Sequence, residues 1–273
     1  MSVRSLLSRL GLALLALLAL AGADPLLAAG KCERLIASGN PDQPPYLWRD
    51  PQHPQQLIGA SADLLKELGQ ALGLKIALVD AGKRSAAEAD AASGRVDLLA
   101  GTYLTAERLE RFDFVHPAYL DLPVHVWVAR DKARQYASLA DLASQSGLAV
   151  GSAAFPPALA EPLAMLKPAR TRHAEDALRQ LQQGKVDYLL LERQAGQGLV
   201  ERLALHGLQA LEPPLGSAPL YLALSHDSAC NDPWLRGQLA KKMTEFVAAG
   251  LPQTLLQRNL QRWKQQPRQP STP

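Results

Sequence analysis

The sequence predicts an α/β fold of the doubly wound kind, built as two lobes. The expected order over the first hundred residues is strand, loop, helix, strand, helix, strand, which is typical of this class. Short apolar runs at residues 96–100 and 186–191 are typical of buried strands. The segments around them resemble each other, with Gly-Arg-Val-Asp-Leu-Leu at 94–99 and Gly-Lys-Val-Asp-Tyr-Leu at 184–189. This echo indicates two lobes of similar build, with ligands expected at the carboxyl ends of the strands.

The first 23 residues predict a secretory signal peptide. Arg4 and Arg9 supply positive charge, and residues 10–20 are almost wholly Leu, Ala and Gly. Small residues follow, so cleavage is expected after this run and at the latest near residue 30. The apolar run is shorter than the about 20 residues that a membrane-spanning helix needs. We therefore expect an exported protein, located in a bacterial periplasm.

Composition excludes several classes of function. Removing the signal leaves about 250 residues, enough for one large or two medium domains. The formal charge of +3 includes Arg4 and Arg9, so the mature chain is nearly neutral. Its basic residues are dispersed, which argues against a nucleic-acid partner. The six histidines show no metal-ligand spacing, and no nucleophile elbow or phosphate-binding glycine loop occurs, so no metal or cofactor is expected.

Two cysteines, Cys32 and Cys230, lie near opposite ends of the chain. In an oxidising compartment they most economically form one disulfide. Two unpaired thiols are the alternative, and a two-cysteine metal site is disfavoured because no histidine lies at ligand spacing from either cysteine. A disulfide requires that the end of the chain return to the lobe in which the chain starts.

The first lobe is expected to alternate strands and helices. Apolar residues recur every three or four positions over residues 62–72, as in an amphipathic helix, and Gly73 suits its C-cap. The other expected elements are a strand at 35–38, a proline-stiffened loop at 39–46, a strand at 74–79, a helix at 85–93 and the strand at 96–100.

The rest of the chain predicts a second α/β unit followed by two helices. The expected elements are alternating strands at 122–130 and 219–225, helices at 138–144, 157–166 and 174–183, strands at 148–151 and 186–191, and C-terminal helices at 233–249 and 251–263. The tail is rich in Gln and Pro and is expected to fray.

The segment from 94 to 119 holds the strongest functional signal. Its buried strand breaks at Gly101, and Thr105 is a predicted N-cap with Glu107 and Arg108 in the helical turn after it. An arginine beside a strand end is well placed to hold a carboxylate, because its planar fork can donate two parallel hydrogen bonds. The alternative is a surface arginine paired with Glu107 or Glu110.

The order of G-x-V-D-L-L, G-T-x-x-T-x-E-R and F-D-F-V-H-P in this segment resembles the periplasmic solute-binding proteins of the polar amino-acid transport type, bacterial family 3. The resemblance implies a type II-like binding-protein fold, in which two doubly wound α/β lobes are joined by a two-strand hinge. It implies one lobe from residues 31–122 and 224–264, a second lobe from 123–223, and a disordered tail at 265–273. Both cysteines then belong to the first lobe.

The resemblance also implies the residues of a ligand site. Arg108 occupies the position that binds the ligand's α-carboxylate, and Glu192 stands where the family usually carries an Asp that binds the α-amino group. The alternative for Glu192 is a solvated carboxylate paired with Arg193. The expected ligand-binding residues are Gly101, Thr102, Tyr103, Arg108, Glu192, Asn40, Tyr46 and Ala154.

Several of these positions depart from the family pattern. Tyr103 replaces a common Ser or Thr, and Gln43 replaces an aromatic residue that covers the ligand, although Tyr46 is close by. Asn40 can face the ligand side chain, and Ala154 lies where a Gly-Thr pair usually meets the carboxylate. The departures argue for a bulkier, more aromatic or less polar ligand, or for a loss of ligand binding.

Three functions follow from the resemblance. The first is a non-catalytic, monomeric binding protein that closes on a small polar solute, an amino acid or related carboxylate, and delivers it to an ABC-type inner-membrane permease or reports it to a membrane sensor. The second is an enzyme like the cyclohexadienyl dehydratases of the family, with Glu192 as general acid and Arg108 as carboxylate clamp. The third is a degenerate lobe pair that acts as a protein-interaction module.

Overall fold

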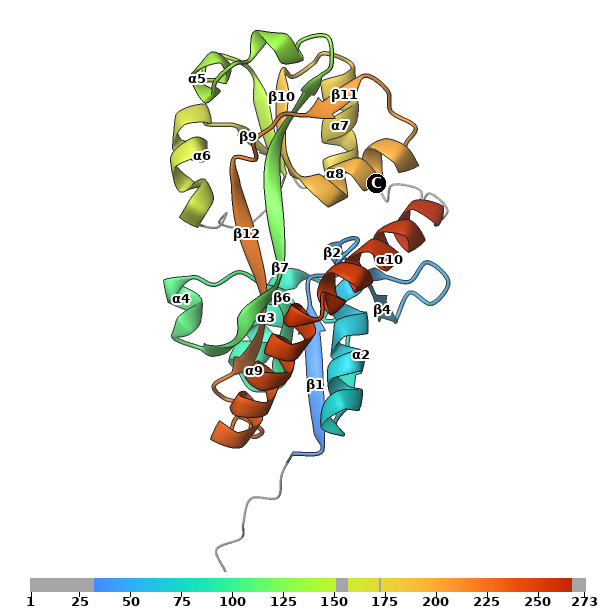
Figure 1. Cartoon of the computed structure of the whole chain (residues 1–273), viewed down its shortest axis with the longest axis vertical. Helices are drawn as coiled ribbons and strands as arrows, with labels where there is room; N and C mark the ends of the chain where they lie inside the picture. The colour runs from blue at the N-terminus through green and yellow to red at the C-terminus, as the bar shows by residue number, and fades with distance from the viewer. Residues whose placement is uncertain (1–31, 151–156, 172, 267–273) are drawn as a thin grey trace, which may run out of the picture. The chain divides into compact units, whose positions relative to one another are not determined.

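The computed structural model describes residues 32–150, 157–171 and 173–266 (Figure 1). The chain divides into two compact units, residues 1–32 and 33–273, and every element below lies in the second. The predicted signal peptide and most of the predicted tail fall outside the described residues. Within them, no helix combines the length and the apolarity needed to cross a membrane.

The second unit has a nine-stranded mixed sheet and a small three-stranded sheet. Its strands are β1 Arg34–Gly39, β2 Asp42–Gln43, β3 Leu47–Arg49, β4 Leu57–Ile58, β5 Lys75–Leu78, β6 Leu98–Thr102, β7 Phe112–Ala129, β8 Gly147–Val150, β9 Ala169–Thr171, β10 Tyr188–Glu192, β11 Leu208–Ala210 and β12 Gly216–Ser225. Its helices are α2 Ala60–Leu72, α3 Arg84–Ala92, α4 Ala106–Leu109, α5 Leu139–Leu142, α6 Ala160–Leu166, α7 Ala174–Gln182, α8 Arg193–Arg202, α9 Pro233–Ala248 and α10 Leu251–Gln265, with 3₁₀ turns at Ala133–Gln135 and Pro157–Leu159.

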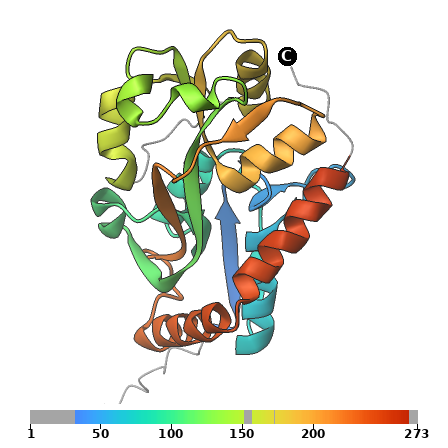
Figure 2. The same ribbon diagram turned by 45° about the horizontal axis from the view of Figure 1, so that its top comes forward.

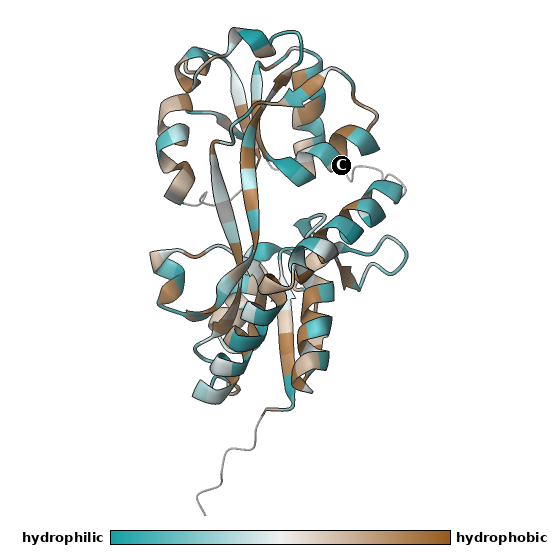
Figure 3. Cartoon of the chain, in the orientation of Figure 1, coloured by the Kyte–Doolittle hydropathy of each residue, from teal (hydrophilic) through white to brown (hydrophobic). Residues whose placement is uncertain are grey.

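The first strand group, β1, β5 and β6, is parallel, with β1 between the other two. Helix α2 precedes β5 in the chain and buries Leu64, Leu65 and Leu68 along one face, as its apolar period predicts. The helix ends at Gly73 in the left-handed conformation, with φ of 68°, and the Gly73 N–H bonds back to the last turn. Figure 3 shows apolar residues along the middle of β1. These elements confirm the α/β order expected for the start of the chain.

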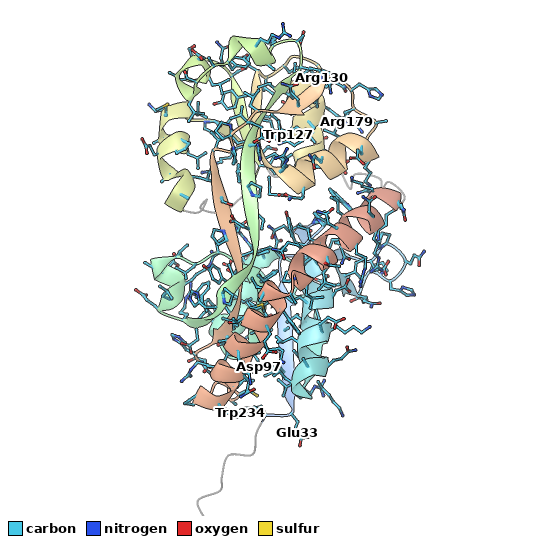
Figure 4. The ribbon with its side chains drawn as sticks, in the orientation of Figure 1. Glu33, Asp97, Trp127, Arg130, Arg179 and Trp234 are labelled. Atoms are coloured by element: carbon cyan, nitrogen blue, oxygen red, sulfur yellow. The ribbon has the colours of Figure 1, made fainter. Side chains whose placement is uncertain are left out.

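The second strand group, β8, β9 and β10, is also parallel, with β8 between β9 and β10. Residues 188–191 of β10 are buried, as the apolar run predicts. Leu189 and Leu191 pack with α7 and α8 around Trp127, which Figure 4 labels on β7, whereas Tyr188 and Leu190 pack in a second cluster with Val126. Because β6 and β10 each lie in a parallel group after similar segments, the echo in the sequence corresponds to similar local structure.

Strands β7 and β12 connect the two strand groups and run antiparallel to each other (Figure 1). β12 pairs with β6, and β7 pairs with β10. β7 is longer than the strand expected at 122–130, because the segment from Phe112 is also extended. Its ladder with β12 is interrupted between Val115 and Leu120. Pro117 lies in this interruption, where the missing N–H of proline costs no ladder hydrogen bond.

Helix α8 was not predicted, and two glycines explain why. Gly196 and Gly198 lower helix propensity by about 1 kcal/mol each relative to alanine. Close packing accounts for both of them. A Cβ atom at Gly196 would lie 2.3 Å from the Trp127 ring, and one at Gly198 would lie 2.4 Å from the Trp263 ring. Trp263 belongs to α10, which follows α9 and packs against both α2 and α8 (Figure 2).

The disulfide prediction is confirmed. Cys32 and Cys230 are both disulfide-bonded, and they are the two cysteines of the chain. The alternative of two free thiols is therefore excluded.

A carboxylate at the start of β6 supports the first strand group. Asp97 Oδ2 accepts from the Ile36 N–H at 2.7 Å, and Oδ1 accepts from Ser228 Oγ at 2.6 Å. Figure 4 labels Asp97 beside the lower strands. The side chain thus links β1, β6 and the segment after β12 through two charge-assisted bonds.

We expect Asp97→Asn to lower the free energy of unfolding by about 1–3 kcal/mol, because the new amide N–H₂ would face one of these two donors. Urea unfolding followed by circular dichroism measures the change. Asp121→Asn, at an exposed position of β7, is the matched control and should stay within about 0.5 kcal/mol of the parent. Equal stability of the two variants would show that the Asp97 bonds are dispensable.

Candidate functional site

Arg108 is the third residue of α4, in the turn that follows the N-cap Thr105. Thr105 Oγ1 accepts from the Arg108 N–H at 3.3 Å, so the predicted cap is confirmed. The guanidinium points back toward β6: Nη1 donates to the Tyr103 carbonyl at 3.1 Å, and Nη2 donates to Glu88 Oε1 at 2.5 Å. The side chain is 13% exposed. Its acidic partner is thus on α3, and Glu107 bonds to Arg111 instead, at 3.4 Å.

A pocket lies at the carboxyl ends of β1 and β6, next to α3. This edge is where open α/β sheets bind ligands. The lining residues are Gly39, Asn40, Arg84, Ala87, Glu88, Leu99, Ala100, Gly101 and Thr102. Three of the predicted site residues, Asn40, Gly101 and Thr102, therefore share one pocket with Glu88, which bonds to Arg108.

Arg84 places a second cation at this pocket. Its Nε lies 4.0 Å from Glu88 Oε1, one helical turn along α3. The positions i and i+4 share a helix face, so Arg84 and Glu88 both face the pocket. Neither residue was predicted as part of the site, because the helix expected at 85–93 begins one residue after Arg84, whereas the observed helix includes it.

Glu192 ends β10 and caps the helix that follows. Its Oε1 accepts from the Gln194 N–H at 2.9 Å, and its Oε2 accepts from the Ala195 N–H at 2.8 Å. Arg193 does not pair with Glu192 in the way the alternative supposed, and instead bonds to Glu212 at 2.7 Å. Burial raises the pKa of Glu192 from 4.5 to about 7, against the opposing effects of the two amide bonds and of the Tyr46 hydroxyl.

Three buried tyrosines accompany these charged groups. Tyr103 Oη accepts from Gln43 Nε2 at 3.3 Å, and Tyr119 Oη lies 2.7 Å from Ser61 Oγ. Tyr46 is 2% exposed, and its hydroxyl lies close enough to the Glu192 carboxylate to oppose the rise in the pKa of Glu192.

Electrostatics link these tyrosines to Glu192. Burial raises the pKa of Tyr46 and of Tyr103, and the Glu192 carboxylate raises both further. Arg84 and Arg108 lower the pKa of Tyr103. The Tyr103 hydroxyl is therefore influenced by the charges of Glu192, Arg84 and Arg108. Burial likewise raises the pKa of Tyr119. All three phenols are neutral hydrogen-bonding groups at neutral pH.

The structure thus brings most of the predicted site residues into one region. Asn40, Gly101 and Thr102 line the pocket, Arg108 bonds to Glu88 of that lining, and Tyr103 connects Arg108 with Tyr46 and Glu192. Ala154 lies outside the described residues, and its role stays a prediction. Among the described residues, no group of three or more His, Cys, Asp or Glu side chains is arranged to hold a metal ion.

Comparison with known families identifies the chain. Residues 35–262 match the family of bacterial extracellular solute-binding proteins, family 3. The chain belongs to this family. The match spans both strand groups and every residue of the site described above. A search of curated proteins found no match.

Solved structures of this fold include proteins with different functions. An amino acid ABC transporter substrate-binding protein, AbpA from Streptococcus pneumoniae, bound to L-arginine, is 21% identical, with a TM-score of 0.65 over 86% of this chain and 97% of its own. A histidine kinase sensor domain similar to periplasmic binding proteins is 20% identical, with a TM-score of 0.66 over 84% and 96%. The ancestral amino acid-binding protein AncCDT-1, described as a precursor of cyclohexadienyl dehydratase, is 20% identical, with a TM-score of 0.62 over 84% and 96%. At these identities the likeness shows the fold alone.

The raised pKa of Glu192 predicts a pH dependence of stability. A carboxyl group whose pKa is higher in the folded than in the unfolded state binds its proton more tightly when folded. Its stabilising contribution is full below about pH 4.5 and is lost as the pH rises through about 7. We expect the melting temperature of the parent to fall more steeply between pH 5 and pH 8 than that of Glu192→Gln.

Differential scanning fluorimetry across this pH range measures the effect. Glu201→Gln is the matched control on the same helix, because its side chain is 60% exposed. It should keep the slope of the parent. Parallel curves for the parent and Glu192→Gln would contradict the raised pKa.

Proposed function

We propose that the protein is an exported, non-catalytic receptor for a small carboxylate-bearing solute, which Arg108 holds. The observation that carries this proposal is the position of the Arg108 guanidinium. It is 13% exposed, is fixed by the Tyr103 carbonyl, and bonds to a carboxylate that lines the pocket at the strand ends. A carboxylate oxygen already occupies one of its donors, so the geometry suits this kind of ligand.

We propose that binding closes the protein about β7 and β12. Residues 31–122 and 224–264 form one lobe in this proposal, and residues 123–223 form the other. The interruption of the β7–β12 ladder supports this hinge, because the backbone there makes fewer hydrogen bonds that a rotation would break. Closure would hold the solute between Arg108 of the first lobe and Glu192 of the second, and would exclude water from both.

The destination of the solute follows from the same proposal. A periplasmic receptor of this family would act as a monomer and pass its ligand to an inner-membrane permease of the ABC type, or would report it to a membrane sensor. The transporter protein and the kinase sensor domain among the similar structures support both outcomes through their shared fold.

Substitution of Arg108 tests the clamp. We expect Arg108→Ala to weaken binding of the carboxylate solute at least about tenfold, because a hydrogen bond to a charged group contributes about 1.5–3 kcal/mol. The melting temperature should change little, since Glu88 is partly exposed and stays hydrated when its partner is removed. A thermal-shift screen of amino acids and small carboxylates finds the ligand, and calorimetric titration then gives the affinities of parent and variant.

Arg111→Ala is the matched control, because Arg111 follows the same helix and is 45% exposed. Among the described residues, its acidic partner is Glu107. This variant should bind like the parent. Loss of folding in Arg108→Ala would mean that the arginine is structural, and retained binding would remove it from the site.

An enzyme on the same scaffold is the second candidate, and the pKa of Glu192 favours it. A carboxyl group with a pKa of about 7 is suited to general acid catalysis at neutral pH. In a prephenate-like acid it would protonate the leaving hydroxyl group. The C–O bond would break to release water, the carboxylate carbon would leave as carbon dioxide, and the electron pair of its C–C bond would complete the aromatic ring.

Incubation of the mature protein with prephenate at pH 7 tests this candidate. If it is correct, the absorbance of phenylpyruvate should rise in alkaline samples, and Glu192→Gln should abolish the rise. If both proteins form phenylpyruvate only at the uncatalysed rate, the enzyme is excluded and the binding function stands.

A further inference from the structure

Arg84 brings unused hydrogen-bonding capacity to the pocket. It is the first residue of α3, and its side chain is 28% exposed. Its acidic contact is Glu88, whose Oε1 lies 4.0 Å from Arg84 Nε, beyond the distance of a hydrogen bond. Among the described residues the Arg84 guanidinium makes no hydrogen bond, so the five N–H groups of this side chain remain available to a solute.

Arg108 is more fully engaged by the protein. Its Nη1 donates to the Tyr103 carbonyl and its Nη2 donates to Glu88 Oε1, so two of the five N–H groups of an arginine are taken. Of the described residues that line the pocket, Arg84 is the only cation, and Arg108 contacts this lining through Glu88. The pocket is therefore a subsite beside Arg108, with a cation of its own.

Two uncharged side chains of the lining add further donors. Asn40 Oδ1 accepts from the Asp42 N–H at 3.2 Å, which leaves the amide N–H₂ of Asn40 without an acceptor among the described residues. Thr102 is buried, and within the same part of the chain its hydroxyl makes no hydrogen bond. Arg84, Asn40 and Thr102 thus offer donors in one pocket, which suits the oxygen atoms of an anion.

The backbone of α3 favours an anion at the same place. Arg84, Ala87 and Glu88 all line the pocket and lie in the first two turns of this helix. The N-cap Lys83 makes no side-chain capping bond, and the first turn contains no acidic residue. The positive end of the helix dipole is therefore not compensated within that turn and stabilises a negative charge nearby.

We propose that this pocket is a second carboxylate site and that the solute is a short dicarboxylate. Arg108 holds one carboxylate, and Arg84 holds the other together with Asn40 and Thr102. This inference rests on the proposed function and narrows it to acids with two carboxylates. Arg84 then determines specificity, because a solute with a carboxamide at the second position leaves the Arg84 charge without its anion.

The positions of the two arginines suit a short solute. Arg108 Nη2 and Arg84 Nε lie 2.5 and 4.0 Å from the same Glu88 oxygen, so the two guanidinium groups are close neighbours. Two carboxylates joined by a short carbon chain can therefore each contact one arginine. A long chain between them would have to fold back on itself.

A second carboxylate adds negative charge to a region that already contains Glu88 and Glu192. The N-termini of α3 and α8 oppose this charge. Glu192 can also take up a proton, because its pKa of about 7 lies close to neutral pH and a nearby anion raises that pKa further. An ammonium group on the solute would compensate the Glu192 carboxylate instead, so dicarboxylates with and without an amino group both fit.

Pairs of acids and amides test the proposal. The mature protein is titrated calorimetrically at pH 7.5 with L-aspartate and L-asparagine, L-glutamate and L-glutamine, and succinate and succinamate. The members of a pair have nearly the same size and differ in the second carboxylate. We expect the diacid to bind at least about tenfold more tightly than its amide in whichever pair binds.

Variants of Arg84 show whether this residue causes the preference. Arg84→Gln should weaken binding of the diacid at least about tenfold and change binding of the amide less than about twofold, because only the diacid pairs with the Arg84 charge. Arg84→Lys keeps the charge and should keep a preference for the diacid. Arg95→Gln is the matched control, since Arg95 follows the same helix, is 69% exposed and pairs with Asp90, and it should bind like the parent.

The outcomes separate this inference from the function on which it rests. If an amide binds as tightly as its diacid and Arg108→Ala abolishes that binding, the receptor function stands and the second carboxylate site is overturned. The site is also overturned if Arg84→Gln weakens both members of a pair equally, as a structural role would, or keeps the preference of the parent. If no member of any pair binds, the inference is overturned, and the thermal-shift screen of other carboxylates then decides the receptor function.

Discussion

The pairing of β7 with β12 is the constraint on which the rest of the structure depends. Each strand group is joined to this ladder through one member: β6 through Tyr221 and Thr102, and β10 through Val124 and Glu192. Thr102 lines the pocket, and Glu192 borders the tyrosines. Two residues about 90 positions apart in the sequence therefore come to one region because their strands are neighbours of the same two long strands.

Compensation of charge shapes the site that this ladder assembles. A buried or partly buried charge must be paired, and the chain pairs its own: Arg108 with Glu88, and Glu192 with the amides that open α8. These contacts hold the side chains in place without a ligand. The same contacts decide what can be added, because a solute carboxylate at Arg108 must share or displace the bond to Glu88.

Local patterns in the sequence predicted the fold well, and predicted the site in part. The apolar period of α2, the buried run of β10 and the cap at Thr105 depend on neighbouring residues, so they were visible. Helix α8 was not predicted because its two glycines are required by contacts with the Trp127 and Trp263 rings, which are distant in sequence. For the same reason the partner of Arg108 was sought at Glu107 and Glu110, within one helical turn, whereas it lies twenty residues away on α3.

Internal pairing also changes where the selectivity of such a site comes from. When a solute carboxylate replaces or joins Glu88 at Arg108, one charge-assisted contact is largely exchanged for another, and the net gain in free energy from the ion pair is small. Discrimination between solutes then depends on the other groups of the region, such as the Tyr103 hydroxyl, which accepts from Gln43 at 3.3 Å. A solute that displaces Gln43 without replacing this hydrogen bond leaves a buried hydroxyl unsatisfied, at a cost of about 1–3 kcal/mol.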